Sequence, residues 1–359
     1  MSRALLAVKP AVRAIRAYTL AARDARIKVN QNESPYDVSA ETKRAVLEKA
    51  LARPWSRYPP FDPRELTDAL ADFAGWRRDG VLAGNGSNEL IEALLMVVVG
   101  QGTSVVIPEP TFTLYALLTG ILGGQPVRVP LTTDLAYDTD ALIEAARASK
   151  AALTIVCSPN NPTGTALSSA DVARLCEAND GLVAVDEAYH EFSGQTVAPL
   201  LAAHGNLVVL RTFSKALGLA GLRVGYLLAA PELVREIDKA RLPYNINFIS
   251  QLAALAVLER HAERAASVRR MVAGRDALSA AIAAIPGLRP YPSQANFVLV
   301  EVTRGEARAL FEALYADGIL VRDVTAYPML ERCLRVSVGT EEENEAVIAS
   351  LRRHAKGAS

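Results

Sequence analysis

Residues 152–186 contain the stretch that decides the fold, and they read ALTIVCSPNNPTGTALSSADVARLCEANDGLVAVD. Two short apolar runs, Ala152–Ser158 and Leu182–Asp186, flank an amphipathic segment, Ser168–Asn179. Near-continuous apolar strands joined by a helix are typical of a parallel sheet that helices cover on both faces. We therefore expect an α/β unit at the centre of the chain.

The same alternation of apolar runs and amphipathic segments extends from about residue 80 to residue 230. Thr139–Ala148 has the pattern of a further helix. Further strands are predicted at Ser104–Pro108, Val127–Pro130, Leu207–Arg211 and Val224–Ala229. The last of these follows a loop rather than a helix, which makes it a candidate for an antiparallel strand. The sheet is therefore predicted to be mostly parallel.

The pattern changes after residue 245. A long helical tract runs from Asn247 to about Ile285. Beyond it the sequence predicts strands at Asn296–Glu301, Ile319–Arg322 and Leu334–Val338, and helices at Gly305–Asp317 and Glu341–His354. We predict a large α/β domain over residues 40–245. An N-terminal arm and a smaller α+β domain are predicted over residues 1–39 and 246–359.

The composition excludes several classes of protein. The 359 residues contain 39 Lys and Arg and 39 Asp and Glu, and 50% of them are hydrophobic. This balance argues against a disordered chain and against a nucleic-acid or acidic-membrane partner. No apolar run reaches the roughly 20 residues of a membrane helix. The three cysteines and four histidines are scattered, so we expect a reducing, cytoplasmic location and no metal site.

The basic N-terminal segment allows two interpretations. Met1 to Arg23 contains several arginines and no acidic residue, which resembles a mitochondrial transit peptide. A solvated basic helix that leads into the fold is the preferred interpretation, because short basic amphipathic stretches are common.

Residues that can carry chemistry follow three of the predicted strands. Asn161 lies in Ser158-Pro-Asn-Asn-Pro-Thr-Gly164, where its amide can bind a ring hydroxyl. Asp186 ends its strand, so its carboxylate needs a cationic partner such as a protonated pyridine nitrogen. Tyr189, three residues further on, can reach the same pocket. A turn without function remains the alternative for the Asn161 segment.

The segment Arg211–Arg223 reads RTFSKALGLAGLR and follows the next strand. Thr212, Ser214 and Arg223 offer hydroxyl and guanidinium donors for a phosphate. Lys215 stands among small and apolar residues, where partial desolvation favours the neutral amine that Schiff-base chemistry needs. An ordinary surface lysine is the alternative interpretation.

A glycine loop, LAGNGSNELI over residues 82–91, opens a helix and offers free N–H groups to an anion. Ser87 and Asn88 also suit a plain helix cap. The loop is neither GxGxxG nor a P-loop, so nucleotide binding is disfavoured. Together with Phe112 as a ring-stacking group, these segments supply what pyridoxal phosphate requires: a phosphate anchor, an acid for the ring nitrogen and an amine nucleophile.

From about Tyr18 to Arg353 the sequence resembles the fold-type I pyridoxal-phosphate-dependent aminotransferases, and within them those acting on histidinol phosphate. The segments that carry the resemblance are Lys28–Pro35 (KVNQNESP), Arg57–Pro59 (RYP), Ser158–Gly164, Ser214–Arg223 and Leu334–Thr340 (LRVSVGT). The resemblance implies a large domain built on a mostly parallel seven-stranded sheet, with a smaller α+β domain.

The resemblance also implies roles for single residues. Lys215 binds the cofactor covalently and moves the substrate proton, Asp186 holds the pyridine nitrogen, and Asn161 and Tyr189 bind the 3′ oxygen of the ring. The implied phosphate ligands are Gly86, Ser87, Asn88, Thr212, Ser214 and Arg223, with Tyr58 reaching the phosphate of the neighbouring subunit in a homodimer. Arg335 and Arg322 are the implied anion-binding residues of the substrate site, in which Asn161 also takes part, and Tyr18 and Tyr244 flank the imidazole.

The implied reaction converts L-histidinol phosphate and 2-oxoglutarate to imidazole acetol phosphate and L-glutamate, a step of histidine biosynthesis. An aromatic amino-acid aminotransferase and a phosphothreonine decarboxylase remain alternatives on the same scaffold. A non-catalytic binding or regulatory protein is the alternative of a different class.

Overall fold

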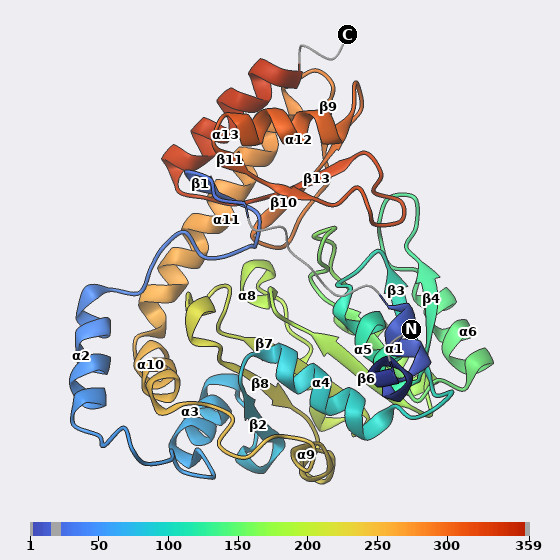
Figure 1. Ribbon diagram of the computed structural model, residues 1–359, viewed down its shortest axis with the longest axis vertical. Coiled ribbons are helices and arrows are strands. Elements are labelled where there is room, and N and C mark those ends of the chain that lie inside the picture. Colours follow the sequence, from blue (N-terminus) through green and yellow to red (C-terminus); the bar gives the residue numbers. More distant parts are fainter. Residues whose placement is uncertain (1–2, 16–22, 356–359) are drawn as a thin grey trace.

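A seven-stranded mixed sheet forms the centre of the larger unit (Figure 1). The structure is a computed structural model that describes residues 3–15 and 23–355. The strand order is β2 (Val81–Gly84), β8 (Gly225–Leu228), β7 (Leu207–Thr212), β6 (Leu182–Asp186), β5 (Leu153–Cys157), β3 (Ser104–Glu109) and β4 (Gln125–Pro130). Only β8 runs antiparallel to its neighbours. The prediction of a mostly parallel sheet is confirmed, and so is the prediction that Val224–Ala229 forms an antiparallel strand. Strand β2, which runs straight into the glycine loop, is not among the predicted strands.

Helices cover both faces of this sheet because its inner strands are apolar on both sides. In β6, Val183 and Val185 belong to one buried cluster and Ala184 to the other. On the first face lie α3 (Arg64–Ala74), α6 (Thr139–Ser149) and α7 (Ser169–Ala178). On the second lie α4 (Ser87–Val98), α5 (Leu114–Leu122) and α9 (Pro231–Asp238), with the short α8 (His190–Ser193).

A smaller unit contains two further sheets (Figure 1). The four-stranded antiparallel sheet has the order β12 (Arg322–Asp323), β13 (Cys333–Ser337), β10 (Phe297–Val302) and β9 (Leu288–Pro290). In the second sheet, β1 (Ile27–Lys28) pairs in parallel with β11 (Ile319–Leu320). The predicted strand Ile319–Arg322 is therefore wrong as one element, because its two halves pair with different strands. Three helices complete the unit: α11 (His261–Ala283), α12 (Ala307–Ala316) and α13 (Glu341–His354).

The predicted helical tract after residue 245 is two helices rather than one. Helix α10 (Phe248–Glu259) ends at Arg260, whose backbone (φ −110°, ψ 28°) departs from helical geometry before α11 begins. The apolar residues of α10 pack with those of α2 (Ala40–Leu51) and α3 in the core of the larger unit. The domain division remains a proposal, with residues 40–245 in the larger domain and residues 1–39 and 246–359 in the smaller one. Helix α10, which this division assigns to the smaller domain, packs against the larger unit.

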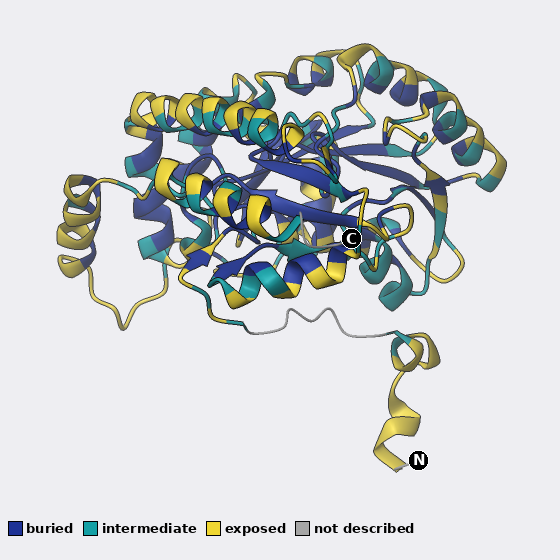
Figure 2. Ribbon diagram, turned by 90° about the horizontal axis from the view of Figure 1, so that it is seen from above, coloured by how far each residue is buried: buried dark blue, intermediate teal, exposed yellow. Residues whose placement is uncertain are grey.

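The N-terminal residues 3–15 form two short turns, η1 (Arg3–Ala7) and α1 (Pro10–Ala14), in which no residue is buried. Figure 2 shows them as an exposed arm at the side of the molecule, in which α1 contacts α5. Among the described residues no helix combines the length and apolarity needed to cross a bilayer.

Candidate active site

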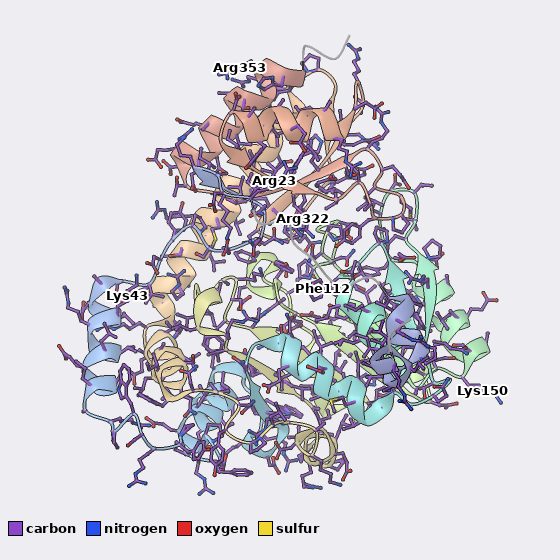
Figure 3. The ribbon with its side chains drawn as sticks, viewed as in Figure 1. Arg23, Lys43, Phe112, Lys150, Arg322 and Arg353 are labelled. Carbon is purple, nitrogen blue, oxygen red and sulfur yellow. The ribbon has the colours of Figure 1, made fainter. Side chains whose placement is uncertain are left out.

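A pocket of about 270 Å³ opens at the carboxyl ends of β5, β6 and β7, between the two units. It brings together most of the residues singled out in the sequence: Ser87, Asn88, Phe112, Asn161, Asp186, Tyr189, Thr212, Ser214, Lys215, Arg223, Arg322 and Arg335. Phe112 and Arg322 both lie near the middle of the molecule, where the two units meet (Figure 3). The carboxyl edge of an open α/β sheet is where such folds bind ligands.

Asp186 lies at the buried end of β6. Its Oδ2 accepts a hydrogen bond of 2.7 Å from the Tyr115 hydroxyl, and its Oδ1 accepts one of 3.1 Å from the Ala188 N–H. Burial raises the pKa of the Asp186 carboxyl to about 6, although both hydrogen bonds act in the opposite direction. A buried carboxylate of this kind is stabilised by a cation placed above the end of the strand.

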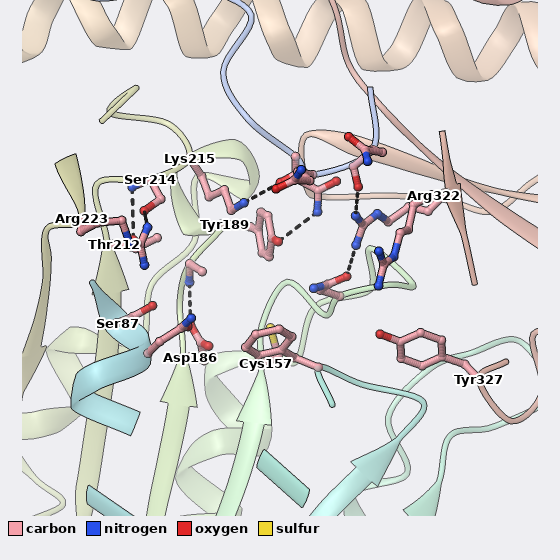
Figure 4. Close-up of a pocket in the computed structure, with 18 residues that line it drawn as sticks. Ser87, Cys157, Asp186, Tyr189, Thr212, Ser214, Lys215, Arg223, Arg322 and Tyr327 are labelled. Carbon is pink, nitrogen blue, oxygen red and sulfur yellow. Dashed lines mark hydrogen bonds between the residues drawn. The ribbon is translucent and has the colours of Figure 1, made fainter. Parts of the chain in front are cut away.

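Lys215 lies in the loop after β7, and its ammonium reaches the pocket (Figure 4). The Nζ atom donates a hydrogen bond of 2.7 Å to the Gln31 carbonyl and lies 6.0 Å from the centre of the Tyr189 ring. Burial, followed by the charge of Arg335, lowers the pKa of Lys215 to about 8. The lowered pKa increases the fraction of neutral amine near physiological pH, and the neutral form is the one that a nucleophile requires.

The start of α4 forms a cradle of hydrogen-bond donors. Gly86 is the residue before the helix and has φ +83°, and no side chain caps the helix. The alternative interpretation, in which Ser87 or Asn88 serves only as a helix cap, is therefore wrong; both line the pocket. Arg223 Nη1 donates to Ser214 Oγ at 3.0 Å. A Cβ at Gly86 would lie 2.5 Å from Arg223 Nη2, so a larger residue would displace this guanidinium and would also be strained at the positive φ.

Two arginines from the smaller unit form the opposite wall. Arg335 of β13 is buried and donates to Asn161 Oδ1 and, at 2.7 Å, to the Asn30 carbonyl. Arg322 is its partner in β12. Among the residues that the structure describes, Arg322 has no hydrogen-bond or ion-pair partner, so its guanidinium is available to an anion.

A buried ion pair braces the strand ends beneath the pocket. Arg211 Nε of β7 lies 2.9 Å from Glu187 Oε2, directly after β6. Arg211 also donates to Thr196 Oγ1 at 2.6 Å and to the Tyr226 hydroxyl at 3.3 Å. The pair joins the two segments that carry Asp186 and Lys215, although neither Arg211 nor Glu187 lines the pocket.

Sequence reasoning missed several lining residues, namely Asn30, Gln31, Asn32, Cys157, Ala188 and Tyr327. The first three lie inside the KVNQNESP segment, whose resemblance to the family was itself the signal. Tyr327 belongs to the loop between β12 and β13, which has no recognisable pattern. The described residues contain no cluster of His, Cys, Asp and Glu side chains suited to a metal ion.

Two predicted site residues lie away from the pocket of this chain, and one lies outside the described residues. Tyr58 and Tyr244 stack on the surface with ring centres 4.5 Å apart, and Phe61 meets Tyr244 edge-on. Tyr58 is 81% exposed. Tyr18 falls in the segment that is not described. The roles suggested for these three residues remain proposals.

Comparison with known proteins identifies the family. Residues 25–351 match the family described as aminotransferase class I and II. The chain belongs to this family. It is 40% identical over 346 residues to a histidinol-phosphate aminotransferase of Chlorobium phaeovibrioides, covering 96% of both proteins. An enzyme of the same name from Chlorobaculum tepidum is 39% identical over 348 residues, which is 96% of this chain and 99% of that protein.

Solved structures give the same result. The crystal structure of histidinol-phosphate aminotransferase from Sinorhizobium meliloti, in complex with pyridoxal-5′-phosphate, superimposes with a TM-score of 0.89. It covers 98% of each chain at 27% identity. The predicted fold-type I aminotransferase architecture is confirmed.

Proposed function

We propose that this class I/II aminotransferase uses pyridoxal phosphate to convert L-histidinol phosphate and 2-oxoglutarate to imidazole acetol phosphate and L-glutamate, in histidine biosynthesis. The observation that carries the proposal is the pairing of two anion-binding walls in one pocket. The α4 cradle with Arg223 lies on one side, and Arg322 and Arg335 lie on the other. Relatives of about 40% identity over nearly the whole chain are named for this activity.

The hydrogen-bond donors and acceptors that line the pocket suit the cofactor. The uncapped start of α4 and the room at Gly86 suit a phosphate held by Ser87, Asn88, Thr212, Ser214 and Arg223. Asp186 stands where a protonated ring nitrogen would relieve its buried charge. Phe112 offers its ring for stacking, and Asn161 and Tyr189 offer polar groups to the 3′ oxygen.

When bound, pyridoxal phosphate supplies an electron sink for negative charge that develops at the substrate carbon bearing the amino group. Lys215 would then have two tasks: its amine would hold the cofactor covalently, and, once the substrate amine has displaced it, would move the proton from that substrate carbon to the C4′ carbon of the cofactor. Its lowered pKa suits both tasks, since a base works best when its pKa is near the operating pH. Asp186 keeps the ring nitrogen protonated and so deepens the sink.

The arginine wall explains how one site can accept two different substrates. Histidinol phosphate carries a phosphate and no carboxylate, whereas glutamate carries two carboxylates. Arg335 and Arg322 can bind either kind of anion, because a guanidinium matches both geometries. We assign Asn161, which is bonded to Arg335, to the same substrate site. Tyr18 is proposed to flank the imidazole. Tyr244 lies away from the pocket of its own chain and would flank the imidazole in the site of a partner subunit.

We further propose that the enzyme is a cytoplasmic homodimer with shared active sites. The support is a surface patch on two adjoining segments, residues 51–61 and 242–244, which touch where Tyr244 meets Tyr58 and Phe61. Its exposed large apolar side chains are Leu51, Trp55, Tyr58, Phe61, Leu242 and Tyr244. Monomeric proteins seldom expose so many such residues together. A partner covering this patch would receive Tyr58 at its own cofactor phosphate.

Lys215→Ala tests the proposed chemistry. We expect the variant to lose transamination by at least about a thousandfold while it still binds pyridoxal phosphate through the phosphate cradle. Lys49→Ala, an exposed lysine on α2, is the matched control and should keep full activity. Full activity of Lys215→Ala would contradict the role given to this residue.

A substrate panel tests the specificity. Purified protein is assayed with histidinol phosphate, phenylalanine and O-phosphothreonine. We expect histidinol phosphate to give the highest kcat/KM. Fast turnover of phenylalanine with negligible turnover of histidinol phosphate would instead identify an aromatic amino-acid aminotransferase. Release of carbon dioxide from O-phosphothreonine would identify a decarboxylase, and a colourless protein unable to bind pyridoxal phosphate would rule out all three.

A further inference from the structure

The segment Asn30–Asn32 makes three successive contacts with residues of the pocket (Figure 4). The Asn30 carbonyl accepts from Arg335, the Gln31 carbonyl accepts from Lys215, and Asn32 Nδ2 donates to the Tyr189 hydroxyl at 3.0 Å. The first two contacts use the backbone and do not depend on the side chain present. The third depends on the amide of Asn32, and the proposed function gives that amide no role.

The orientation of the Asn32 amide is fixed by Ser337. The Asn32 N–H donates to Ser337 Oγ at 2.9 Å, so this oxygen acts as an acceptor there. The hydroxyl of Ser337 in turn donates to Asn32 Oδ1 at 2.7 Å. Turning the amide over would leave the buried Ser337 proton without this acceptor, which is costly in a buried site. The Nδ2 group of Asn32 must therefore face Tyr189.

This arrangement decides the direction of the hydrogen bond at Tyr189. Nδ2 carries only protons, so the Tyr189 oxygen accepts from Asn32 and cannot donate to it. We propose that Asn32 is a positioning residue that turns the hydroxyl proton of Tyr189 toward the pocket, so that the phenol donates to the 3′ oxygen of the cofactor. The inference rests on the proposed function, because it needs a ring oxygen at that place.

The same network joins the cofactor site to the strand that carries Arg335. Ser337 lies two residues beyond Arg335 in β13, so the two side chains leave the strand on the same face. Asn296, just before β10, adds a bond of 3.1 Å from its Nδ2 to the Asn32 carbonyl. The smaller unit thus holds Asn32 from two sides, and its position is transmitted to Tyr189.

Asn32 is also suited to this place by its backbone. Its φ is +56°, in the left-handed region that asparagine and aspartate tolerate better than most residues, and it is 1% exposed. Aspartate can therefore replace it with the same shape. An ionised carboxylate only accepts hydrogen bonds, so Asn32→Asp should draw the Tyr189 proton away from the pocket.

The test measures the pH midpoint at which the absorbance of bound pyridoxal phosphate changes. A hydrogen bond donated to the 3′ oxygen favours its charged form and lowers this midpoint. We expect Asn32→Asp to raise the midpoint by about one unit, as Tyr189→Phe should also do. The charged and titratable groups that act on the Tyr189 phenol are Arg335 of β13, Cys157 of β5 and Asp186 of β6, and the Lys215 ammonium lies over its ring.

Tyr189→Phe supplies the control for the new charge that aspartate brings. If Asn32 acts through the phenol, Asn32→Asp adds almost nothing to the midpoint in the Tyr189→Phe background. An equal shift in both backgrounds would show an effect of the negative charge alone and would overturn the proposal. An unchanged midpoint in the Asn32→Asp variant that keeps Tyr189 would also overturn the proposal.

A second variant covers a failure of Asn32→Asp to fold. Ser337→Ala keeps Asn32 and frees its amide to turn, so we expect a smaller rise of the midpoint that is again absent with Tyr189→Phe. No rise in Ser337→Ala would then overturn the proposal. Wild-type protein that bound no pyridoxal phosphate would contradict the proposed function itself, whereas a normal wild-type titration with unchanged variants contradicts only the role of Asn32.

Discussion

At the scale of single residues, burial moves two titratable groups of the pocket toward their neutral forms. The pKa of Lys215 falls from 10.5 to about 8, and the pKa of Asp186 rises from 3.8 to about 6. Each change favours the neutral form of a group that the folded protein keeps away from water. The amino-acid composition cannot reveal these pKa shifts, because a chain with equal numbers of acidic and basic residues can still bring several cations together in one pocket.

The lowered pKa of Lys215 has a consequence for stability. Where folding lowers a lysine's pKa, burying the charged lysine reduces the stability of the folded protein. This cost is absent above the unfolded pKa of 10.5 and grows as the pH falls toward 8. In protein stripped of cofactor we expect Lys215→Met to raise the free energy of unfolding at pH 7 by up to about 3 kcal/mol. The gain should shrink toward zero at pH 10.5.

Urea denaturation at pH 7 and at pH 10 checks this prediction. Lys150→Met is the control, because Lys150 is exposed at the end of α6 and its charge is not desolvated. A gain in Lys215→Met that does not depend on pH would show that better packing, rather than the charge, is responsible.

At the scale of elements, local patterns predicted what depends on local sequence. The strand Leu182–Asp186 and the helix Glu341–His354 agree with the structure in every residue. The strand predicted at Ile319–Arg322 fails because its halves pair with β1 and β13, which are distant in sequence. The break at Arg260 carries no glycine or proline, so nothing local marks it. Site residues at strand ends, such as Asp186, could be predicted because the apolar pattern of the strand before them is local in the sequence.

The close contact between β8 and α4 should be sensitive to any added side-chain atom. Gly225 approaches the first turn of α4 so closely that a Cβ would lie 2.3 Å from the Ser87 backbone nitrogen. Gly225→Ala must push the start of α4 away from β8, so we expect a loss of about 1–3 kcal/mol in unfolding free energy. The affinity for pyridoxal phosphate should fall about tenfold or more, since 1.4 kcal/mol corresponds to a factor of ten.

Gly221→Ala is the matched control, because nothing lies within 4 Å of a Cβ at this position, four residues before Gly225. Thermal unfolding and a fluorescence titration with pyridoxal phosphate measure both effects. Equal behaviour of the two variants would mean that α4 does not need its close approach to β8.

At the scale of the whole molecule, the pocket belongs to neither unit alone. The larger unit supplies Asp186 and Lys215, and the smaller one supplies Arg322 and Arg335. The N-terminal segment Asn30–Asn32 lies between them, which no local pattern could predict because its partners are far away in the sequence. The family resemblance of KVNQNESP marked the segment but not its contacts.

The apolar surface patch should lose its ability to join two subunits when it carries a charge. Leu51 is 76% exposed at the end of α2, within the patch proposed to join two subunits. Placing a charge there makes burial against a partner costly. We expect Leu51→Arg to shift the protein from dimer to monomer in analytical ultracentrifugation and to lower its activity.

Glu345→Arg on the exposed face of α13 is the control, and it should leave the oligomeric state unchanged. Wild-type protein that sediments as a monomer would refute the homodimer. A dimer that persists in Leu51→Arg would place the subunit contact on another surface.

The pairing of β1 with β11 sets an order of events during synthesis. Ile27 and Lys28 leave the ribosome early, but their partners Ile319 and Leu320 follow only after almost the whole chain has been made. Until then the adjoining residues 30–32 cannot be held in place over the pocket. A nascent chain can therefore complete its large sheet, whose strands end at residue 228, long before it owns a finished catalytic centre. The enzyme acquires its chemistry last, when β1 pairs with β11.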